Sequence, residues 1–380
     1  MRIGIDLSLI PGERAGGGQY GYQLAAAQAR VDRRHRYRLY PVFYYIVHPD
    51  YAQTEFPTSE RMQLAFRHLP SPLVRWLWRA EGPALVKEWM LGPVDVVHST
   101  TLCAPRLSAR KRLVVTIYDV SFVTHPEFHL EANIRHCLAG TREAIERADA
   151  ILAISEHTRR DLVERMGAPP DRVLVTPLAP DPSLARVTDP ARLDEVRRRY
   201  GLPERFVLFV GTLEPRKNIA RLIDAYATLP ERLQRDAGLV MAGGKGWLSD
   251  TMQDEVARRG MGDRVRFIGY VRPEDMASLY SLATTFAYPS LYEGFGLPVL
   301  EAMVCGTPVL TSNVSSLPEV AGDAALLVSP TDVGEIADGL AQMLEDAALA
   351  AKLSARGLEW TTRFSWDRCA RETLAVYESL

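Results

Sequence analysis

Two glutamates with seven residues between them stand in the segment richest in groups that could do chemistry. This segment, residues 290–309, carries Glu293, then Gly294 and Gly296, and then Glu301. Two carboxylates could form the acid and base pair of a glycosidase, which must flank one bond at about 5–10 Å. Because a helix is expected to begin between them, we expect Glu293 near a reacting centre and Glu301 near a hydroxyl-bearing group.

The glycines of this segment predict a turn from a strand into a helix. Pro298 follows near the first helical turn, where its missing N–H removes no hydrogen bond. Free N–H groups at a helix N-terminus attract anions, so this turn could receive a phosphate. The same glycines also fit a turn that only joins a strand to a helix, and spacing alone does not separate the two interpretations.

A second candidate is the adjacent cation pair Arg216 and Lys217, in the run Val-Gly-Thr-Leu-Glu-Pro-Arg-Lys-Asn of residues 210–218. The pair follows an expected strand and precedes an expected helix. Two cations at a strand's carboxyl end are suited to a diphosphate. An isolated pair of this kind would also fit a solvated loop.

A third candidate is the glycine run Gly16, Gly17 and Gly18, which follows the first expected strand. It lacks the spacing of a dinucleotide-binding fingerprint. A flexible glycine loop could still let the backbone approach a phosphate.

The elements that would position these residues alternate between short apolar strands and amphipathic helices. This alternation predicts parallel sheets covered on both faces. Strands are expected at residues 2–7, 37–47, 94–98, 113–118, 150–154 and 173–176, and again at 206–210, 239–242, 265–268, 285–288, 308–311 and 325–328. Helices are expected at 19–30, 130–147 and 156–166, and after a candidate N-cap at Asn218, where Ile219, Leu222, Ile223 and Tyr226 form one apolar face.

Residues 177–203 contain five prolines and a run of three arginines, which marks a break in this pattern. We therefore expect an α/β protein of two doubly wound, Rossmann-like domains that face a cleft. The domains are residues 1–185 and 186–365, and a C-terminal helix, residues 366–380, is expected to brace their interface. Ligands in such sheets bind at the carboxyl ends of the strands.

Composition excludes several classes of function. The 380 residues carry 45 basic and 47 acidic side chains, so there is no basic excess for binding nucleic acid. No apolar run approaches the roughly 20 residues of a membrane span. Four widely spaced cysteines fit neither a zinc site nor a disulfide scaffold and favour a reducing cytoplasm.

The run Gly-Thr-Leu-Glu-Pro-Arg-Lys-Asn-Ile, followed by Glu-Gly-Phe-Gly-Leu-Pro-x-Leu-Glu-Ala-Met, resembles the family-4 retaining glycosyltransferases. These are nucleotide-sugar enzymes of the GT-B fold, and the paired glutamates are their most specific motif. The resemblance is tight over residues 207–330 and looser in the first half. There the glycine run, residues 116–119 (Thr-Ile-Tyr-Asp) and residues 153–158 stand where that family has them.

The resemblance implies roles. Arg216 and Lys217 would hold the donor diphosphate, Glu293 would orient the donor sugar and stabilise charge on its ring, and Glu301 would bind the ribose hydroxyls. Asp119 is assigned with Glu293, Arg216 and Lys217 to the catalytic set. The residues assigned to substrate binding beside Glu301 are Gly17, Gly18, Gly211, Thr212, Gly294, Phe295, Gly296 and Leu297. No metal or other cofactor is implied, because arginine and lysine neutralise the leaving group.

One departure concerns Tyr118, since relatives often carry a histidine there that contacts the donor sugar. His98 and His125 are nearby candidates, although a lone histidine at a strand end is more often structural. The basic, aromatic segment 73–79, with Trp89 beyond it, could form an acceptor or membrane-surface site, but an amphipathic core helix is favoured.

These observations predict a metal-independent retaining glycosyltransferase in the cytoplasm, with peripheral contact at the inner membrane face. It would move a sugar from a nucleotide-sugar donor to a glycan or lipid-linked acceptor in polysaccharide biosynthesis. Similarity to polysaccharide mannosyltransferases makes GDP-mannose the first expectation for the donor. The alternatives are a GT-B nucleotide-sugar epimerase or phosphorylase, and a non-catalytic nucleotide-sugar-binding protein.

Overall fold

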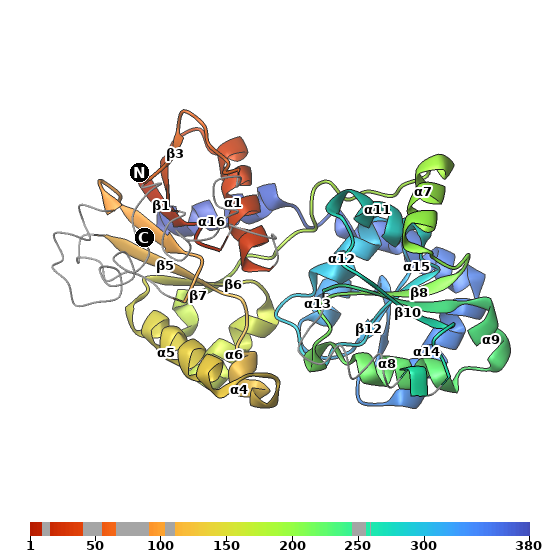
Figure 1. Cartoon of the computed structure of the whole chain (residues 1–380). Coiled ribbons are helices and arrows are strands. Elements are labelled where there is room, and N and C mark those ends of the chain that lie inside the picture. Colours follow the sequence, from red (N-terminus) through yellow and green to blue (C-terminus); the bar gives the residue numbers. More distant parts are fainter. Residues whose placement is uncertain (10–15, 41–54, 66–90, 103–110, 245–255, 259) are drawn as a thin grey trace. The chain divides into compact units, whose positions relative to one another are not determined.

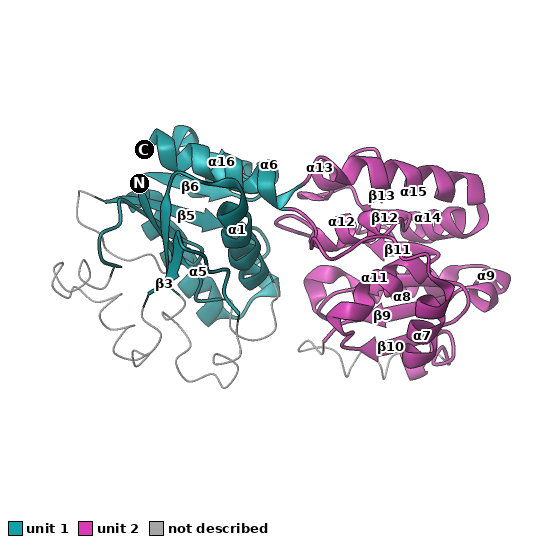
Figure 2. Cartoon of the chain, turned by 90° about the horizontal axis from the view of Figure 1, so that it is seen from above, with its two compact units in different colours: residues 1–178, 365–380 teal, residues 179–364 magenta. Residues whose placement is uncertain are grey.

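The structure is a computed structural model that describes residues 1–9, 16–40, 55–65, 91–102, 111–244, 256–258 and 260–380. The chain divides into two compact units, shown in Figure 2. Unit 1 comprises Met1–Leu178 together with Ser365–Leu380, and unit 2 comprises Ala179–Phe364. Each unit is described separately below.

In unit 1 the described residues form a seven-stranded parallel sheet in the order β3-β2-β1-β4-β5-β6-β7 (Figure 1). Its strands are β1 (Arg2–Asp6), β2 (Arg36–Tyr40), β3 (Met62–Leu64), β4 (Val96–Ser99), β5 (Arg112–Ile117), β6 (Ala150–Ala153) and β7 (Val173–Val175). Its helices are α1 (Gly17–Val31), α4 (Ser121–Thr124), α5 (Glu131–Arg147), α6 (Glu156–Met166) and α16 (Trp366–Ser379), with 3₁₀ turns at Pro126–Phe128 and Pro170–Arg172.

The core of unit 1 joins the two ends of the chain. Ile3 and Ile5 of β1 are fully buried and pack in one cluster with Leu374 and Tyr377 of α16. Helix α16 also packs along α1. The last helix therefore completes the core of the unit that contains the first strand.

In unit 2 the described residues form a six-stranded parallel sheet in the order β10-β9-β8-β11-β12-β13. The strands are β8 (Phe206–Val210), β9 (Gly238–Ala242), β10 (Val265–Gly269), β11 (Thr285–Tyr288), β12 (Val309–Ser312) and β13 (Ala325–Val328). The helices are α7 (Pro190–Tyr200), α8 (Ile219–Thr228), α9 (Glu231–Asp236), α11 (Pro273–Leu282), α12 (Leu297–Val304), α13 (Leu317–Ala321), α14 (Val333–Glu345) and α15 (Ala347–Thr361), with a 3₁₀ turn at Pro215–Lys217.

The strand order of unit 2 reverses between β8 and β11. From β8 the chain adds β9 and β10 on one side, whereas β12 and β13 follow β11 on the other. In open parallel sheets, connections that leave in opposite directions open a crevice at the carboxyl ends of the two strands. The loops that leave those ends carry Arg216 and Lys217 after β8, and Glu293 after β11.

The expected secondary structure is largely confirmed, and its differences are local. Each expected strand is present within the described residues, although residues 41–47 of the second strand lie outside them. Strand β3 is additional, because three residues are too few to show a periodicity. Helix α1 begins at Gly17, so Gly17 and Gly18 lie in a helical turn rather than in a loop. Residues 73–79 and Trp89 are outside the described residues.

Candidate functional site

A tight connection brings the loop after β8 against the loop after β11. Asn218 adopts a left-handed conformation with φ of 61° and, instead of capping α8, donates through Nδ2 to the carbonyl oxygens of Pro289 (2.9 Å) and Pro330 (2.6 Å). The Leu291 N–H donates to the Arg216 carbonyl oxygen at 2.9 Å. These bonds explain why side chains 76 residues apart in sequence meet.

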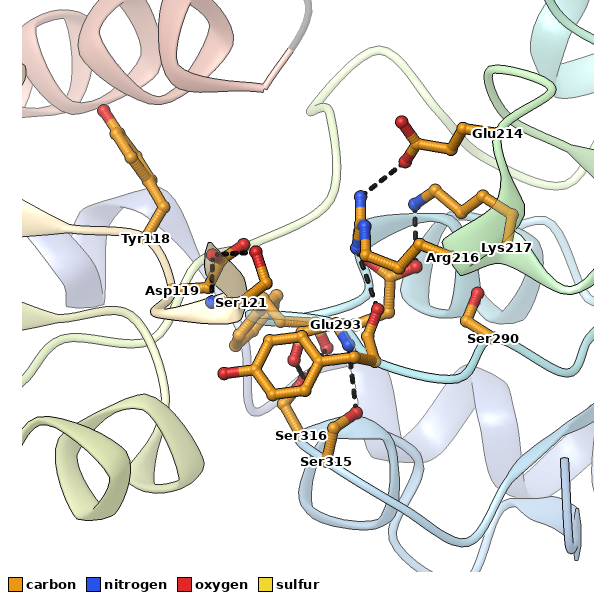
Figure 3. Close-up of polar contacts among 12 residues, drawn as sticks. Tyr118, Asp119, Ser121, Glu214, Arg216, Lys217, Ser290, Glu293, Ser315 and Ser316 are labelled. Atoms are coloured by element: carbon orange, nitrogen blue, oxygen red, sulfur yellow. Dashed lines mark hydrogen bonds and ion pairs between the residues drawn. The ribbon is translucent and has the colours of Figure 1, made fainter. Parts of the chain in front are cut away.

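Glu293 lies between the two cations of the β8 loop (Figure 3). Lys217 Nζ donates to Glu293 Oε1 at 2.7 Å, and Arg216 Nη1 donates to Oε2 at 2.8 Å. Arg216 Nη2 also donates to Glu214 Oε1 at 2.7 Å. The cation pair is therefore engaged by two carboxylates within unit 2, which argues against a loosely solvated loop.

Burial and charge act in opposite directions on this cluster. Lys217 and Glu293 are 9% and 6% exposed. Burial would raise the pKa of Glu293, but the Arg216 guanidinium and the Lys217 ammonium lower it to about 2. Burial lowers the pKa of Lys217, and the Glu293 carboxylate opposes this shift. Ionised Glu293 thus helps to keep the buried lysine charged.

The glycine turn that follows Glu293 is held from α13 and the loop before it. Ser315 Oγ accepts from the Glu293 N–H at 3.1 Å, while Ser316 Oγ donates to the Glu293 carbonyl oxygen at 2.9 Å and to that of Phe295 at 2.8 Å. Gly296 has a φ of 102°, and a Cβ there would lie 2.7 Å from Leu317 Cδ2. Glycine is therefore required where α12 begins, and Pro298 occupies the first turn as expected.

Glu301 sits in the second turn of α12 in a different environment. Its carboxylate Oε2 accepts from the Tyr280 hydroxyl at 3.0 Å. Burial raises the pKa of Glu301, the Tyr280 hydrogen bond lowers it and the Asp181 carboxylate raises it, and the net pKa is about 7. The two glutamates thus have pKa values shifted in opposite directions, which is typical of carboxylates with separate tasks.

Gly211 and Thr212 open the loop that ends in the cation pair. The Gly211 N–H donates to the Ala242 carbonyl oxygen at 2.9 Å. A Cβ on Gly211 would lie 3.9 Å from Tyr288 Cε2, so the loop starts beside the ring whose hydroxyl accepts from Lys217 Nζ.

Of the residues predicted from the sequence, unit 2 brings Arg216 and Lys217 into direct contact with Glu293.

In unit 1, Asp119 follows β5 and is held by its neighbours. Its Oδ1 accepts from the Ser121 N–H at 3.0 Å and from Ser121 Oγ at 2.7 Å, and Ser121 Oγ lies 2.9 Å from His129 Nε2. Tyr118 donates from its hydroxyl to the Thr100 carbonyl oxygen at 2.9 Å. A Cβ on Gly17 would lie 3.1 Å from that hydroxyl, so Gly17 allows α1 to start beside Tyr118.

The two nearby histidines have structural surroundings. His98 is fully buried, with Nδ1 2.6 Å from the Tyr377 hydroxyl and Nε2 2.7 Å from Thr116 Oγ1. Burial lowers its pKa to about 3, so it stays neutral at ordinary pH. His125 stacks on Phe128 with ring centroids 5.5 Å apart.

Several site residues escaped the sequence interpretation. Tyr280 and Tyr288 are apolar positions by pattern, and nothing in their spacing shows that their hydroxyls meet Glu301 and Lys217. Ser315 and Ser316 also hold the glycine turn without any motif of their own. Over the part of the chain that the structure describes, no group of three His, Cys, Asp or Glu side chains could hold a metal ion, and no helix is long and apolar enough to cross a membrane.

Two doubly wound parallel sheets, with this polar cluster at the strand reversal of one of them, define a GT-B fold. Solved structures with that fold agree. Sucrose-phosphate synthase from Thermosynechococcus elongatus matches with a TM-score of 0.78 at 23% identity, over 100% of this chain and 98% of that one. WaaG, described as a glycosyltransferase involved in lipopolysaccharide biosynthesis, matches with a TM-score of 0.74 at 19% identity, over 98% and 99%.

Sequence comparisons identify the family. Residues 14–184 match the model for glycosyltransferase family 4, and residues 194–360 match the model for glycosyl transferases group 1. The O-antigen chain mannosyltransferase B of Escherichia coli is 40% identical over 71% of this chain and 71% of that protein. The serotype-specific mannosyltransferase WbdA of E. coli is 34% identical over 74% of this chain, which spans 35% of that longer protein. The chain belongs to this glycosyltransferase family and is a glycosyltransferase.

Proposed function

We propose that this glycosyltransferase is a retaining mannosyltransferase that transfers mannose from GDP-mannose to a glycan or lipid-linked acceptor. The observation that carries the donor site is the ion-pair cluster of Arg216 with the buried Lys217 and Glu293 at the strand reversal of unit 2. The mannose donor is supported by relatives named as mannosyltransferases at 40% and 34% identity.

The cation pair suits the chemistry of a departing diphosphate. Cleavage of the sugar–phosphate bond places growing negative charge on the leaving oxygen, and buried cations stabilise that charge more than solvated ones do. Arg216 and Lys217 already lie side by side because the carboxylates of Glu214 and Glu293 hold them. The two cations therefore need little reorganisation when a diphosphate replaces these carboxylates as their partner. We therefore propose that the reaction needs no metal ion.

The two glutamates would divide the work on the donor. Glu293 remains ionised because its pKa is about 2, so it can stabilise positive charge that develops on the sugar ring. Glu301 lies one helical turn further into α12, where its carboxylate would accept hydrogen bonds from the ribose hydroxyls. Backbone N–H groups of residues 294–297 would bind the sugar hydroxyls and the phosphate.

Retention would follow from attack by the acceptor hydroxyl on the face that the diphosphate leaves. A leaving phosphate oxygen can accept the acceptor proton, so no strong protein base is required. We propose that Gly17, Gly18 and Asp119 of unit 1 complete the donor and acceptor contacts. A cytoplasmic location, favoured by the four widely spaced cysteines, and peripheral contact at the inner membrane face belong to the same proposal.

A turnover assay with a panel of labelled nucleotide sugars tests the proposal. Transfer of mannose from GDP-mannose to a glycan or lipid-linked acceptor, with the anomeric configuration kept, is the expected result. An epimerised donor, a sugar phosphate formed with free phosphate, or binding without any product would identify one of the alternative activities instead. Transfer from another donor would leave the catalytic proposal standing and correct the donor.

A further inference from the structure

Four buried aromatic side chains form a continuous row in unit 2, here called the aromatic row: Phe209, Tyr288, Phe286 and Tyr280. Successive ring centroids are 5.7, 5.6 and 5.6 Å apart, and all four residues are fully buried. The row runs from β8 across β11 to α11. Close packing of a protein interior restricts the orientation of each ring.

The two tyrosines of the aromatic row direct their hydroxyls at ionisable groups of the candidate site. Tyr288 accepts a hydrogen bond from Lys217 Nζ, which also lies 5.0 Å from the centre of its ring. Tyr280 donates to Glu301 Oε2 at 3.0 Å. One row of rings therefore contacts both the proposed diphosphate site and the proposed ribose site.

Neither hydroxyl is needed for packing. A phenylalanine would fill either place, as Phe209 and Phe286 do in the same row, and a buried hydroxyl is unfavourable without a partner. Tyr377 satisfies that requirement on the side chains of His98 and Gln28, and some other buried tyrosines do so on the backbone. Tyr226, for example, donates to the Ala237 carbonyl oxygen at 2.8 Å. In Tyr280 and Tyr288 the partner is a site side chain instead.

Lys217 and Glu301 both have flexible side chains, so neighbouring groups must hold them in one position. Lysine ends a flexible four-carbon stem that loses rotamer entropy when it is fixed. Lys217 faces Glu293, Arg216, Glu214 and Tyr288, and of these four Tyr288 alone is a neutral partner. A diphosphate that competes with the carboxylates for Lys217 would leave the Tyr288 contact in place.

We propose that Tyr288 and Tyr280 are positioning residues of the transferase, Tyr288 fixing Lys217 for the donor diphosphate and Tyr280 fixing Glu301 for the ribose. The assignment rests on the proposed function, because it takes those two donor groups as the ligands. Phe286 separates the two tyrosine rings, so the aromatic row also sets the distance between the diphosphate contact and the ribose contact. The row would thereby select donors in which these groups are correctly spaced.

Tyr280 also influences the protonation of Glu301. The groups that face Glu301 are Tyr280 from α11, Asp181 from the segment before α7, and Cys305, which directly follows α12. The Tyr280 hydrogen bond favours the ionised carboxylate. Loss of the hydroxyl therefore raises the pKa of Glu301 above its value of about 7.

The test compares Tyr280→Phe and Tyr288→Phe with Tyr226→Phe, a matched buried tyrosine of the same unit. Calorimetry measures binding of GDP and GMP, or of UDP and UMP where the donor assay selects a uridine donor. Tyr288→Phe should weaken the diphosphate about tenfold and the monophosphate much less, which is the loss expected for one hydrogen bond to a charged group. Tyr280→Phe should weaken both nucleotides about equally and shift the pH dependence of their binding to higher pH. Tyr226→Phe should bind as the wild type does.

Double variants separate positioning from general damage to the fold. In a Lys217→Met background, Tyr288→Phe should cause no further loss, and in a Glu301→Gln background the same holds for Tyr280→Phe. Additive losses would overturn the inference, as would single variants that bind like Tyr226→Phe while wild-type turnover is intact. A wild-type protein that neither binds nor turns over a nucleotide sugar would refute the proposed function, and the inference with it.

Discussion

Lys217 Nζ and Glu293 Oε1 are 2.7 Å apart, and both side chains are almost completely buried. The lysine depends on the carboxylate for its charge, while the proposed substrate depends on the lysine for neutralisation. In the absence of a donor, Glu293 therefore supplies part of the negative charge that a bound diphosphate would bring to Lys217.

The first prediction concerns Glu293→Gln, which keeps the shape of the side chain and removes its charge. Removing the carboxylate leaves the buried Lys217 and the partly buried Arg216 under-compensated, so stability should fall by roughly 3–5 kcal/mol. Nucleoside diphosphate should bind as tightly as to the wild type or tighter, because a competing anion is gone. The kcat should fall by about 10²–10³, as for loss of one preorganised electrostatic contact.

Steady-state kinetics, calorimetry and urea unfolding measure these three quantities on the same preparation. Saturating nucleoside diphosphate should recover more stability in the variant than in the wild type. A variant with unchanged kcat, or one whose chief defect is weaker nucleotide binding, would contradict this role for Glu293. Glu319→Gln, a change to an exposed glutamate of α13, serves as the control.

The second prediction is a pH dependence of stability that belongs to Glu301. Its pKa of about 7 in the folded protein lies above the ordinary value of 4.5. Between these two values the unfolded chain releases a proton that the folded protein retains, so this group's contribution to stability falls as the pH rises and is constant above about 7. Glutamine at position 301 does not titrate, so the Glu301→Gln variant does not lose this stability as the pH rises. Between pH 4.5 and about 7 its free energy of unfolding should increase by on the order of 1–3 kcal/mol relative to that of the wild type.

Urea unfolding of both proteins from pH 4.5 to pH 8 measures that difference. Stability curves that run parallel over the whole range would show that Glu301 has an ordinary pKa. The same variant should bind nucleotide more weakly and raise KM with little change in kcat, because a contact made equally in the ground and transition states does not alter kcat.

The third prediction is that transfer activity survives chelation. In the proposed mechanism Arg216 and Lys217 supply the positive charge that a divalent cation supplies in other transferases, and the sequence contains no Asp-x-Asp triplet. Rates measured in excess EDTA and in added Mg²⁺ or Mn²⁺ should agree within a factor of about two. Activity that is lost in EDTA and restored by either cation would refute a metal-independent mechanism.

The fourth prediction concerns the attachment of α16. Tyr377→Phe removes the hydroxyl that lies 2.6 Å from His98 Nδ1 and accepts from Gln28 Nε2 at 3.4 Å. Both buried partners lose a contact, so thermal or urea unfolding should show a cost of about 1–3 kcal/mol. Arg371→Ala, on the exposed side of α16, should change stability by no more than about 0.5 kcal/mol. Equal stability of the two variants would show that the buried hydrogen bonds contribute nothing net.

Sequence pattern was sufficient for much of this fold because its strands are apolar and regularly spaced. The strands Phe206–Val210 and Thr285–Tyr288 could be predicted from their runs of apolar residues alone. The proximity of Lys217 and Glu293 could not, since it depends on β8 and β11 being neighbours, and periodicity does not reveal strand order. Only the family resemblance connected those two loops before the structure was known.

The remaining omissions have a common physical origin. Tyr280 and Tyr288 have the hydrophobic character of core residues, and their proposed positioning function resides in one hydroxyl each, whose partner lies elsewhere in the chain. Asn218 was expected to cap α8 because asparagine is a common N-cap residue. Its left-handed backbone instead turns the amide toward Pro289 and Pro330, which ties two loops together. The sequence thus correctly predicted that Asn218 directly precedes α8, but not that its side chain binds the carbonyl oxygens of Pro289 and Pro330.

The composition of unit 1 from the two ends of the chain has a consequence for biosynthesis. A ribosome synthesises Ile3 and Ile5 before unit 2, but Leu374 and Tyr377, which share their core, only after unit 2. Unit 2 is complete in sequence before that point, so we expect it to fold first although its synthesis starts later. The nascent sheet of unit 1 would then keep an uncovered apolar face, and chaperones that bind such surfaces would recognise it until α16 has been synthesised.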